Sequence, residues 1–218
     1  MSSRERILSR IRQAQGRGRE GGPSQAEREA LQTYIRAHPR APLPPLAGDL
    51  AECFIARAQS VQSSTDRVGG ESEVPAAVAR YLEAHALPGA GCVWPALAYL
   101  DWRGAGLTLA ARGAHGEDMV GVTGVFAAIA ETGTLMVCSG PDTPSTVSLL
   151  PETHIAIVPV AAIVPHMEDA WDRARAAFGQ LPRAVNFISG PSRTGDIEQR
   201  MVMGAHGPYR VHIILVGG

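Results

Sequence analysis

The sequence contains no lysine, and each of its 20 basic residues is an arginine. Without a lysine amine the chain cannot form a Schiff base with pyridoxal phosphate or a carbonyl substrate, nor use a lysine as general base. The basic residues are balanced by 21 acidic ones, so the formal net charge of -1 gives no overall attraction to nucleic acid or to an anionic membrane. Enzymes that depend on a catalytic lysine are therefore excluded. The charge balance does not favour any class of binding partner.

Cysteine is scarce as well, with three residues far apart in the chain, Cys53, Cys92 and Cys138. No C-x-x-C pair is present to begin a zinc or iron–sulfur site, so any such cluster would have to lie on another chain. We expect the three thiols to be reduced and buried. The histidines form no i, i+4 pair, so the sequence predicts no metal site.

Long apolar runs are missing too. The first ten residues lack the apolar core of a secretory signal, and the longest nearly uncharged apolar stretch, Met119 to Ala130, is too short to span a bilayer. We therefore expect a soluble, cytoplasmic protein. The G-x-S-x-G elbow of serine hydrolases does not occur. The string G-x-G-x-x-G occurs at residues 16–21, but it follows a helical pattern and not an apolar strand, so it does not indicate a dinucleotide-binding enzyme.

The patterning predicts an N-terminal helical arm with a proline-rich linker, residues 1–46, followed by one α/β domain, residues 47–218. In the arm, helices are expected over residues 4–15 and 26–37, before the linker HPRAPLPPL. The domain should alternate helices with short apolar strands around a single core. Its helices are expected near residues 49–63, 73–86 and 167–178, and its strands near residue 93 and over 107–110, 120–130, 134–138, 155–159, 184–189 and 211–216.

Three loops rich in glycine and hydroxyl residues follow apolar strands, and the first is AETGTL, residues 130–135. Glu131 interrupts an otherwise apolar run, where charge is costly. It could act as a general base, as a nucleophile toward an acyl group or as a binder of substrate hydroxyls. Alternatively it only caps the amides of the turn Thr132-Gly133-Thr134. We favour the functional interpretation.

The second loop, GPSRTGDIEQ, covers residues 190–199. The spacing of Gly190 and Gly195 copies the glycine frame of a P-loop, but Asp196 stands at the lysine position. A carboxylate there would repel a triphosphate, so the nucleotide P-loop interpretation fails.

A helix is expected from about residue 197 to 203, so its free N–H groups would form an anion site together with Ser192, Arg193 and Thr194. Alternatively, Thr194 or Asp196 is only an N-cap, with Glu198 complementing the helix dipole. In the third loop, GAHGP, residues 204–208, His206 could be a proton shuttle or an exposed histidine beside a helix-ending glycine.

Taken in order, AETGTL, LPETHIAIVPVAAIVPHMEDAW, GPSRTGDIEQ and GAHGPYRVHIILV resemble the LUD domain family. The resemblance covers roughly residues 117–218, and RERILSRIR near the N-terminus is similar to the helix that opens many members. It implies the α/β fold shared by ribose-phosphate isomerases, glucosamine-phosphate deaminases and CoA-transferases. The family's signature falls on Glu131, Thr132, Gly133, Thr134, Gly190, Pro191, Ser192, Arg193, Thr194, Asp196, Glu198, His206, Gly207 and Pro208.

Among these positions we predict three catalytic side chains, Glu131, Asp196 and His206. Ligand binding is predicted for Thr132, Gly133, Thr134, Gly190, Ser192, Arg193, Thr194, Glu198 and Gly207.

The resemblance also implies a role in a three-protein system that oxidises L-lactate to pyruvate. Its iron–sulfur clusters would be carried by partner proteins, and this chain would hold no cofactor. The first hypothesis is a subunit whose pocket binds lactate, pyruvate or a similar small anion through Arg193 and loop amides. The alternatives are a self-sufficient enzyme that acts on a phosphosugar or CoA thioester through Glu131, and an assembly factor docked by its arginine-rich N-terminal helix.

Overall fold

The computed structural model describes residues 2–16, 22–197 and 200–217. The chain divides into two units, Met1–Leu43 and Pro44–Gly218. The first unit contains α1 (Ser3–Ala14) and α2 (Gln25–Ala37), and both helices begin with a Ser-x-x-Glu capping box that satisfies N–H groups at the helix start. No residue of these two described helices is buried, so neither has a core of its own. Both helices agree with the sequence pattern.

The second unit is built on a six-stranded sheet in the order β1-β12-β7-β4-β2-β3. All its strand pairs are parallel, which confirms the expected α/β class with a parallel central sheet. The strands are β1 (Ser64–Val68), β2 (Ala90–Val93), β3 (Thr108–Ala111), β4 (Val120–Thr123), β7 (Thr153–Pro159) and β12 (Arg210–Val216).

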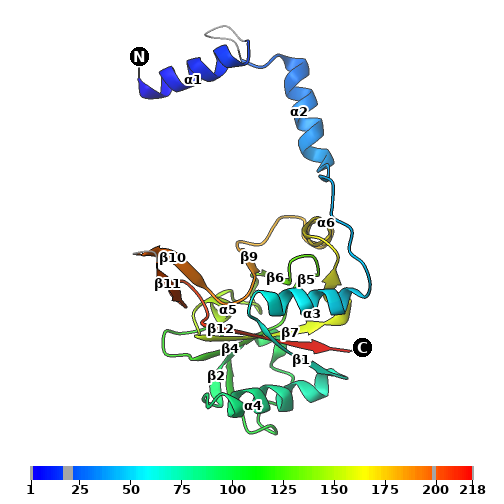
Figure 1. The fold of residues 1–218 in the computed structure, drawn as a ribbon, viewed down its shortest axis with the longest axis vertical. Helices are drawn as coiled ribbons and strands as arrows, with labels where there is room; N and C mark the ends of the chain where they lie inside the picture. The colour runs from blue at the N-terminus through cyan, green and yellow to red at the C-terminus, as the bar shows by residue number, and fades with distance from the viewer. Residues whose placement is uncertain (1, 17–21, 198–199, 218) are drawn as a thin grey trace. The chain divides into compact units, whose positions relative to one another are not determined.

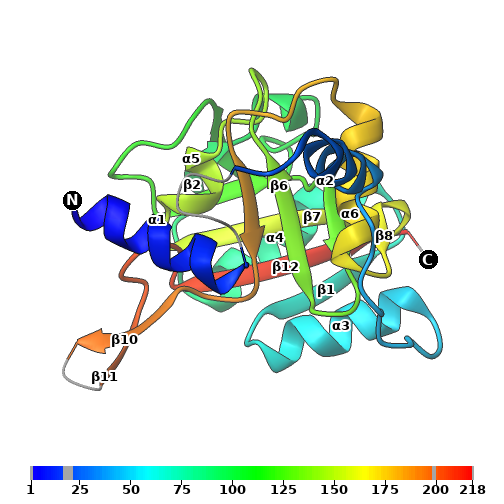
Figure 2. The ribbon, with the colours of Figure 1, turned by 90° about the horizontal axis from the view of Figure 1, so that it is seen from above.

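A second sheet of four strands, in the order β8-β5-β6-β9, runs across the first, as Figure 2 shows. In this sheet β5 pairs parallel with β8, whereas β6 pairs antiparallel with both β5 and β9. Alternate residues of its strands therefore face the first sheet or the opposite side. The strands are β5 (Ala127–Ile129), β6 (Thr134–Cys138), β8 (Ile163–Val164) and β9 (Val185–Ile188).

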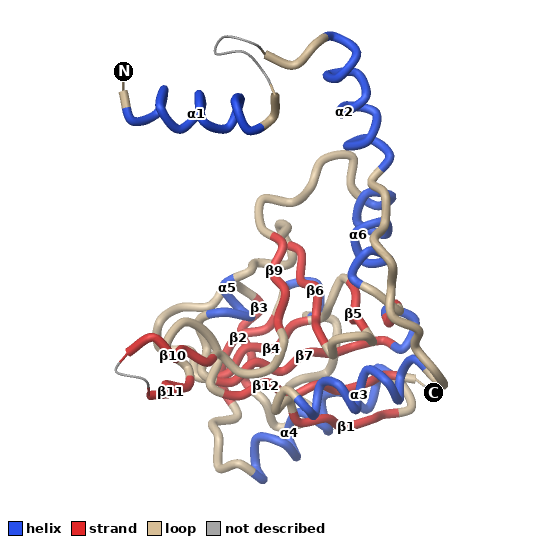
Figure 3. The backbone as a smooth tube through the Cα atoms, turned by 45° about the horizontal axis from the view of Figure 1, so that its top comes forward, coloured by secondary structure: helices blue, strands red, loops and turns tan. Residues whose placement is uncertain are grey.

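The helices and the two sheets form successive layers (Figures 1 and 3). Helix α4 (Val74–Ala84) packs on one face of the six-stranded sheet, and the other face packs against the four-stranded sheet and α3 (Leu50–Ser60). The outer face of the four-stranded sheet is covered by α6 (Met167–Ala177). Shorter helical segments connect these layers: η1 (Glu71–Glu73), η2 (Pro95–Leu97), α5 (Thr146–Leu149) and η3 (Val160–Ala162).

Two of the predicted segments, one strand and one helix, differ from the structure. Residues 120–130 were expected to form one strand, but residues 124–126 leave the parallel sheet and lead into β5 of the second sheet. The helix expected from about residue 197 to 203 is wrong, because β10 (Arg193–Ile197) and β11 (Arg200–Met203) pair as an antiparallel hairpin. Backbone hydrogen bonds from Ser192 to Gly204 and Pro208 join the two strands at their base, and local propensity does not encode these contacts.

Two buried histidines lie within the parallel sheet. The side chain of His154 hydrogen-bonds through Nε2 to Thr123 Oγ1 at 2.8 Å, and that of His212 through Nδ1 to Ser64 Oγ at 2.9 Å. Burial lowers the pKa of each imidazole from 6.5 to about 4, so both are neutral near pH 7. In the part of the chain that is described, no helix has the length and apolar character needed to cross a bilayer.

Candidate functional site

A carboxylate and an imidazole meet where the four-stranded sheet ends. Glu131 Oε2 lies 3.0 Å from His166 Nδ1, and the two side chains are 27% and 12% exposed. At this distance the carboxylate fixes the orientation of the imidazole and favours a proton on Nδ1, which leaves Nε2 as the proton acceptor. The pair therefore has the composition of an oriented general base that is partly open to solvent.

The backbone explains why these two residues meet although they lie far apart in the sequence. Strands β5 and β8 pair in parallel, and the pairing continues beyond them, with the N–H of Glu131 donating to the Pro165 carbonyl at 3.0 Å. His166 directly precedes α6, where its own N–H donates to Asp169 Oδ2 at 3.0 Å. Glu131 thus stands on a sheet end and His166 on a helix start, two rigid supports. His166 is not among the site residues predicted from the sequence, although its position directly after the apolar run AAIVP was a signal for it.

The first glycine loop forms the tight β5–β6 turn. Gly133 has a φ of 66°, and a methyl group there would overlap the backbone nitrogen of Ala58 in α3. Beside it, Thr132 Oγ1 donates to Thr134 Oγ1 at 2.7 Å, and Thr134 Oγ1 lies 2.6 Å from Ser189 Oγ. This chain of hydroxyls connects the first loop to the residue that precedes Gly190.

The second loop rests on the same helix, just past its C-terminal end. Gly190 has a φ of 74°, and a side chain there would overlap the Val61 carbonyl. Arg193 is exposed and donates one N–H from Nη2 to that carbonyl oxygen at 2.9 Å. A cation at this position complements the negative end of the α3 dipole, and the guanidinium has further donors to offer a ligand.

The third loop packs against the second. Ser192 donates its N–H to the Pro208 carbonyl at 2.9 Å and accepts from the N–H of Gly204 at 2.9 Å, while Gly207 approaches the Ser192 side chain. His206 is exposed in this loop. The three loops are therefore contiguous, although the contacts join them through backbone and hydroxyl groups rather than through the predicted catalytic side chains.

The structure changes part of the predicted anion site. Because residues 193–197 are a strand, the expected helix N-terminus with its free N–H groups does not exist there. The backbones of Thr194 and Asp196 lie in β10, and Glu198 lies outside the described residues. Four of the predicted binding residues shape or connect the turns: Thr132, Gly133, Thr134 and Gly190. The side chains best suited to acid–base chemistry and anion binding are therefore the Glu131–His166 pair and Arg193.

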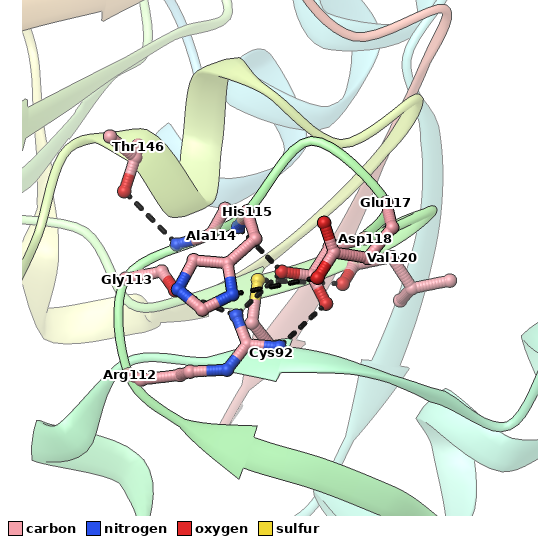
Figure 4. Close-up of polar contacts among 9 residues, drawn as sticks. All are labelled: Cys92, Arg112, Gly113, Ala114, His115, Glu117, Asp118, Val120 and Thr146. Carbon is pink, nitrogen blue, oxygen red and sulfur yellow. Dashed lines mark hydrogen bonds and ion pairs between the residues drawn. The ribbon is translucent and has the colours of Figure 1, made fainter.

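A second polar cluster lies between β3 and β4 (Figure 4). Arg112 forms a bidentate pair with Asp118, at 2.6 and 3.0 Å, and the N–H of His115 donates to the same carboxylate at 2.7 Å. These bonds hold the pKa of Asp118 below its usual value. Burial and the nearby Asp118 charge raise the pKa of the Cys92 thiol to about 12, so it is protonated and not a nucleophile. The cluster clamps the β3–β4 connection.

Replacing Arg112 with alanine is expected to lower the free energy of unfolding by about 2 kcal/mol, because it leaves a nearly buried carboxylate without its main partner. Asp118 is 9% exposed, whereas Arg112 is only half-buried. Solvent near Arg112 screens the ion pair, and this reduces the loss in the free energy of unfolding. Urea unfolding at pH 7 measures the difference. The matched control is Arg103→Ala, at an exposed arginine, and equal stabilities of the two variants would contradict the clamp.

The described residues offer no group of three or more histidine, cysteine, aspartate or glutamate side chains placed to hold a metal ion. Cys92 and Cys138 are buried, and Cys53 is partly exposed in α3. These residues do not fit an iron–sulfur cluster, which needs several converging thiolates.

The C-terminal half of the chain is similar to known proteins. The LUD domain model matches residues 114–216. Lactate utilization protein C of Bacillus subtilis (strain 168) is 44% identical over 100 residues, which are 44% of this chain and 42% of that protein. Its namesake from Exiguobacterium sp. is 40% identical over 119 residues, 53% of this chain and 52% of that protein. The match thus spans only about half the length of these relatives.

A solved structure supports the fold over a larger part of the chain. The crystal structure of a DUF162 family protein from Deinococcus radiodurans matches with a TM-score of 0.60 at 22% identity, covering 79% of this chain and 100% of the other. At this identity the likeness shows the architecture alone. Together with the family match, it supports the resemblance noted in the sequence: residues 114–216 of this chain are similar to the LUD domain.

Proposed function

We propose that this chain takes part in lactate utilization and contributes the Glu131–His166 pair to the oxidation of L-lactate to pyruvate. The observation that carries the proposal is the 3.0 Å contact between the two side chains, within the region that the LUD domain model matches. Conversion of a 2-hydroxy acid to a 2-oxo acid removes two electrons and two protons. A base must accept the hydroxyl proton, and His166 oriented by Glu131 is suited to that task.

The substrate carboxylate needs a cation, and we assign this role to Arg193. Its guanidinium is exposed, and only one of its N–H groups is held by the Val61 carbonyl. The bond to α3 restrains the side chain near the first loop, since Gly133 and Gly190 rest on the same end of that helix. Guanidinium and carboxylate groups form strong charge-assisted hydrogen bonds.

The two electrons also need an acceptor. We propose that iron–sulfur partner proteins take this role, as the resemblance to the LUD domain family implies. In this arrangement the partner proteins would accept the two electrons and the hydrogen on C2, while this chain binds the hydroxy acid and takes its hydroxyl proton.

The test is lactate-dependent dye reduction by the purified chain together with its iron–sulfur partner proteins. Glu131→Gln and His166→Gln are each expected to lower kcat by about 100-fold, because each removes the oriented base. Glu83→Gln, at an exposed position on α4, is the matched control and should retain the full rate. Arg193→Ala is expected to raise KM for lactate more than it lowers kcat.

Unchanged rates in the Glu131 and His166 variants, with the partners still bound, would contradict the catalytic role and favour the assembly-factor alternative. Turnover of a phosphosugar or CoA thioester by the chain alone, abolished by Glu131→Gln, would instead favour a self-sufficient enzyme.

A further inference from the structure

A separate cavity lies at the carboxyl edge of the six-stranded sheet, where β2, β4 and β7 end. Strands β2 and β4 are neighbours in this sheet. After β2 the next strand along the chain is β3, which pairs on the side of β2 away from β4. After β4 the next strand of this sheet is β7, which pairs on the side of β4 away from β2. The chain therefore diverges between β2 and β4, which is a topological switch point. In open α/β sheets, ligands bind in the crevice outside the carboxyl ends of the strands at such a point.

The cavity has a volume of about 200 Å³. A cavity of about 150 Å³ suffices for benzene, so this one accommodates a flat ligand of one or two rings. One wall is the indole of Trp94, which is fixed because its Nε1 donates to the Pro144 carbonyl at 3.1 Å. The other apolar walls include Val74, Leu97, Val125, Ile157 and Pro159.

The polar groups of the lining accept hydrogen bonds. Tyr99 donates its hydroxyl to Glu71 Oε2 at 2.8 Å, which leaves the other carboxylate oxygen and the phenol oxygen as acceptors. Thr143, another residue of the lining, donates its hydroxyl to the Cys138 carbonyl at 2.9 Å, so towards any further group its hydroxyl oxygen can only accept. Among the described residues of the lining, Glu71 is the one charged side chain. An anionic ligand would meet repulsion, whereas a ligand with N–H donors would be complementary.

We propose that this cavity binds a flat heteroaromatic ring that carries an amino group or another N–H donor, stacked near Trp94 and hydrogen-bonded to Glu71. The site is distinct from the Glu131–His166 pair, which lies at the far end of β5, and its charge disfavours lactate or pyruvate. It does not depend on the proposed role in lactate oxidation.

The experiment is isothermal titration of the full chain with adenine and with 2-aminobenzimidazole. Both are expected to bind saturably at one site, and Glu71→Gln should weaken both by about tenfold, since the hydrogen-bond acceptor loses its negative charge. Glu73→Gln, exposed in the same short helix and outside the lining, is the matched control and should bind like the wild type. Benzoate, a ring with a carboxylate in place of the donor, should not bind.

The Glu71 side chain is exposed, so its replacement should leave the thermal unfolding midpoint unchanged and the comparison interpretable. Lack of saturable binding by both amino-substituted rings up to their solubility limit would overturn the proposal. So would equal affinity of the Glu71→Gln and Glu73→Gln variants, or binding of benzoate as tight as that of the two amines.

Discussion

Gly133→Ala is expected to lower the free energy of unfolding by about 4 kcal/mol or more. Gly133 has a φ of 66°, where an alanine costs roughly 1–2 kcal/mol in backbone strain alone. The larger cost comes from the added methyl group, which would overlap backbone atoms of Arg57 and Ala58 in α3. Because backbone atoms cannot move aside as a flexible side chain does, either the turn or the helix must shift. Urea unfolding followed by circular dichroism measures the loss.

The control for this experiment is Gly179→Ala. Gly179 lies outside the set of positive-φ residues, and a methyl group there would meet open space. Its stability should match that of the wild type. If Gly133→Ala were equally stable, the close approach of the β5–β6 turn to α3 would be wrong, and so would the support inferred for Glu131.

Acidification from pH 7 to pH 5 is expected to lower the free energy of unfolding by up to about 4 kcal/mol. Burial lowers the pKa of His154 and His212 from 6.5 to about 4 in the folded state. Between these values the unfolded chain binds a proton at each histidine while the folded chain does not. The free energy of unfolding is therefore highest above pH 6.5. It declines as the pH falls toward 4, by about 1.4 kcal/mol per pH unit for each histidine.

The pH dependence can be assigned by substitution. His154→Gln should flatten the decline between pH 7 and pH 5 by about half, whatever its effect on stability at pH 7, because one of the two groups is removed. His115→Gln, at an exposed histidine, should retain the full slope. Asp118, whose pKa is lowered, contributes only below this range. A wild-type stability that is flat from pH 7 to pH 5 would contradict neutral, buried imidazoles.

Local patterns predicted much of the fold, and they failed where distant contacts decide the structure. Helix α6 and strands β6 and β12 agree with their patterns, because apolar periodicity reflects burial directly. Residues 193–197 and 200–203 form paired strands, where a helix was expected from about residue 197 to 203, because Ser192 is bonded to both Gly204 and Pro208, which holds the two strands together at their base. Strand β1 was missed, since STDRV carries polar residues at an exposed sheet edge.

In the candidate site, too, local patterns indicated single residues but not the contacts between distant ones. Glu131 could be singled out because a carboxylate interrupting an apolar run is unusual. His166 could not be connected with it, since only the parallel pairing of β5 with β8 brings the two together. The placement of Arg193 beside Val61 likewise depends on where β9 ends relative to α3. Such contacts span more than thirty residues, and no pattern along the chain encodes them.

The C-terminal end of α3 also limits how the chain can vary in length. Gly133 touches its last turn, while Gly190 and Arg193 touch Val61 immediately after it, and only residues 61–63 connect the helix to β1. A one-residue insertion in this connection would displace the common support of both loops, with no slack to absorb it. Insertions at an open, exposed position such as Gly179 can bulge into solvent. Residues 61–63 are thus expected to permit no change in length.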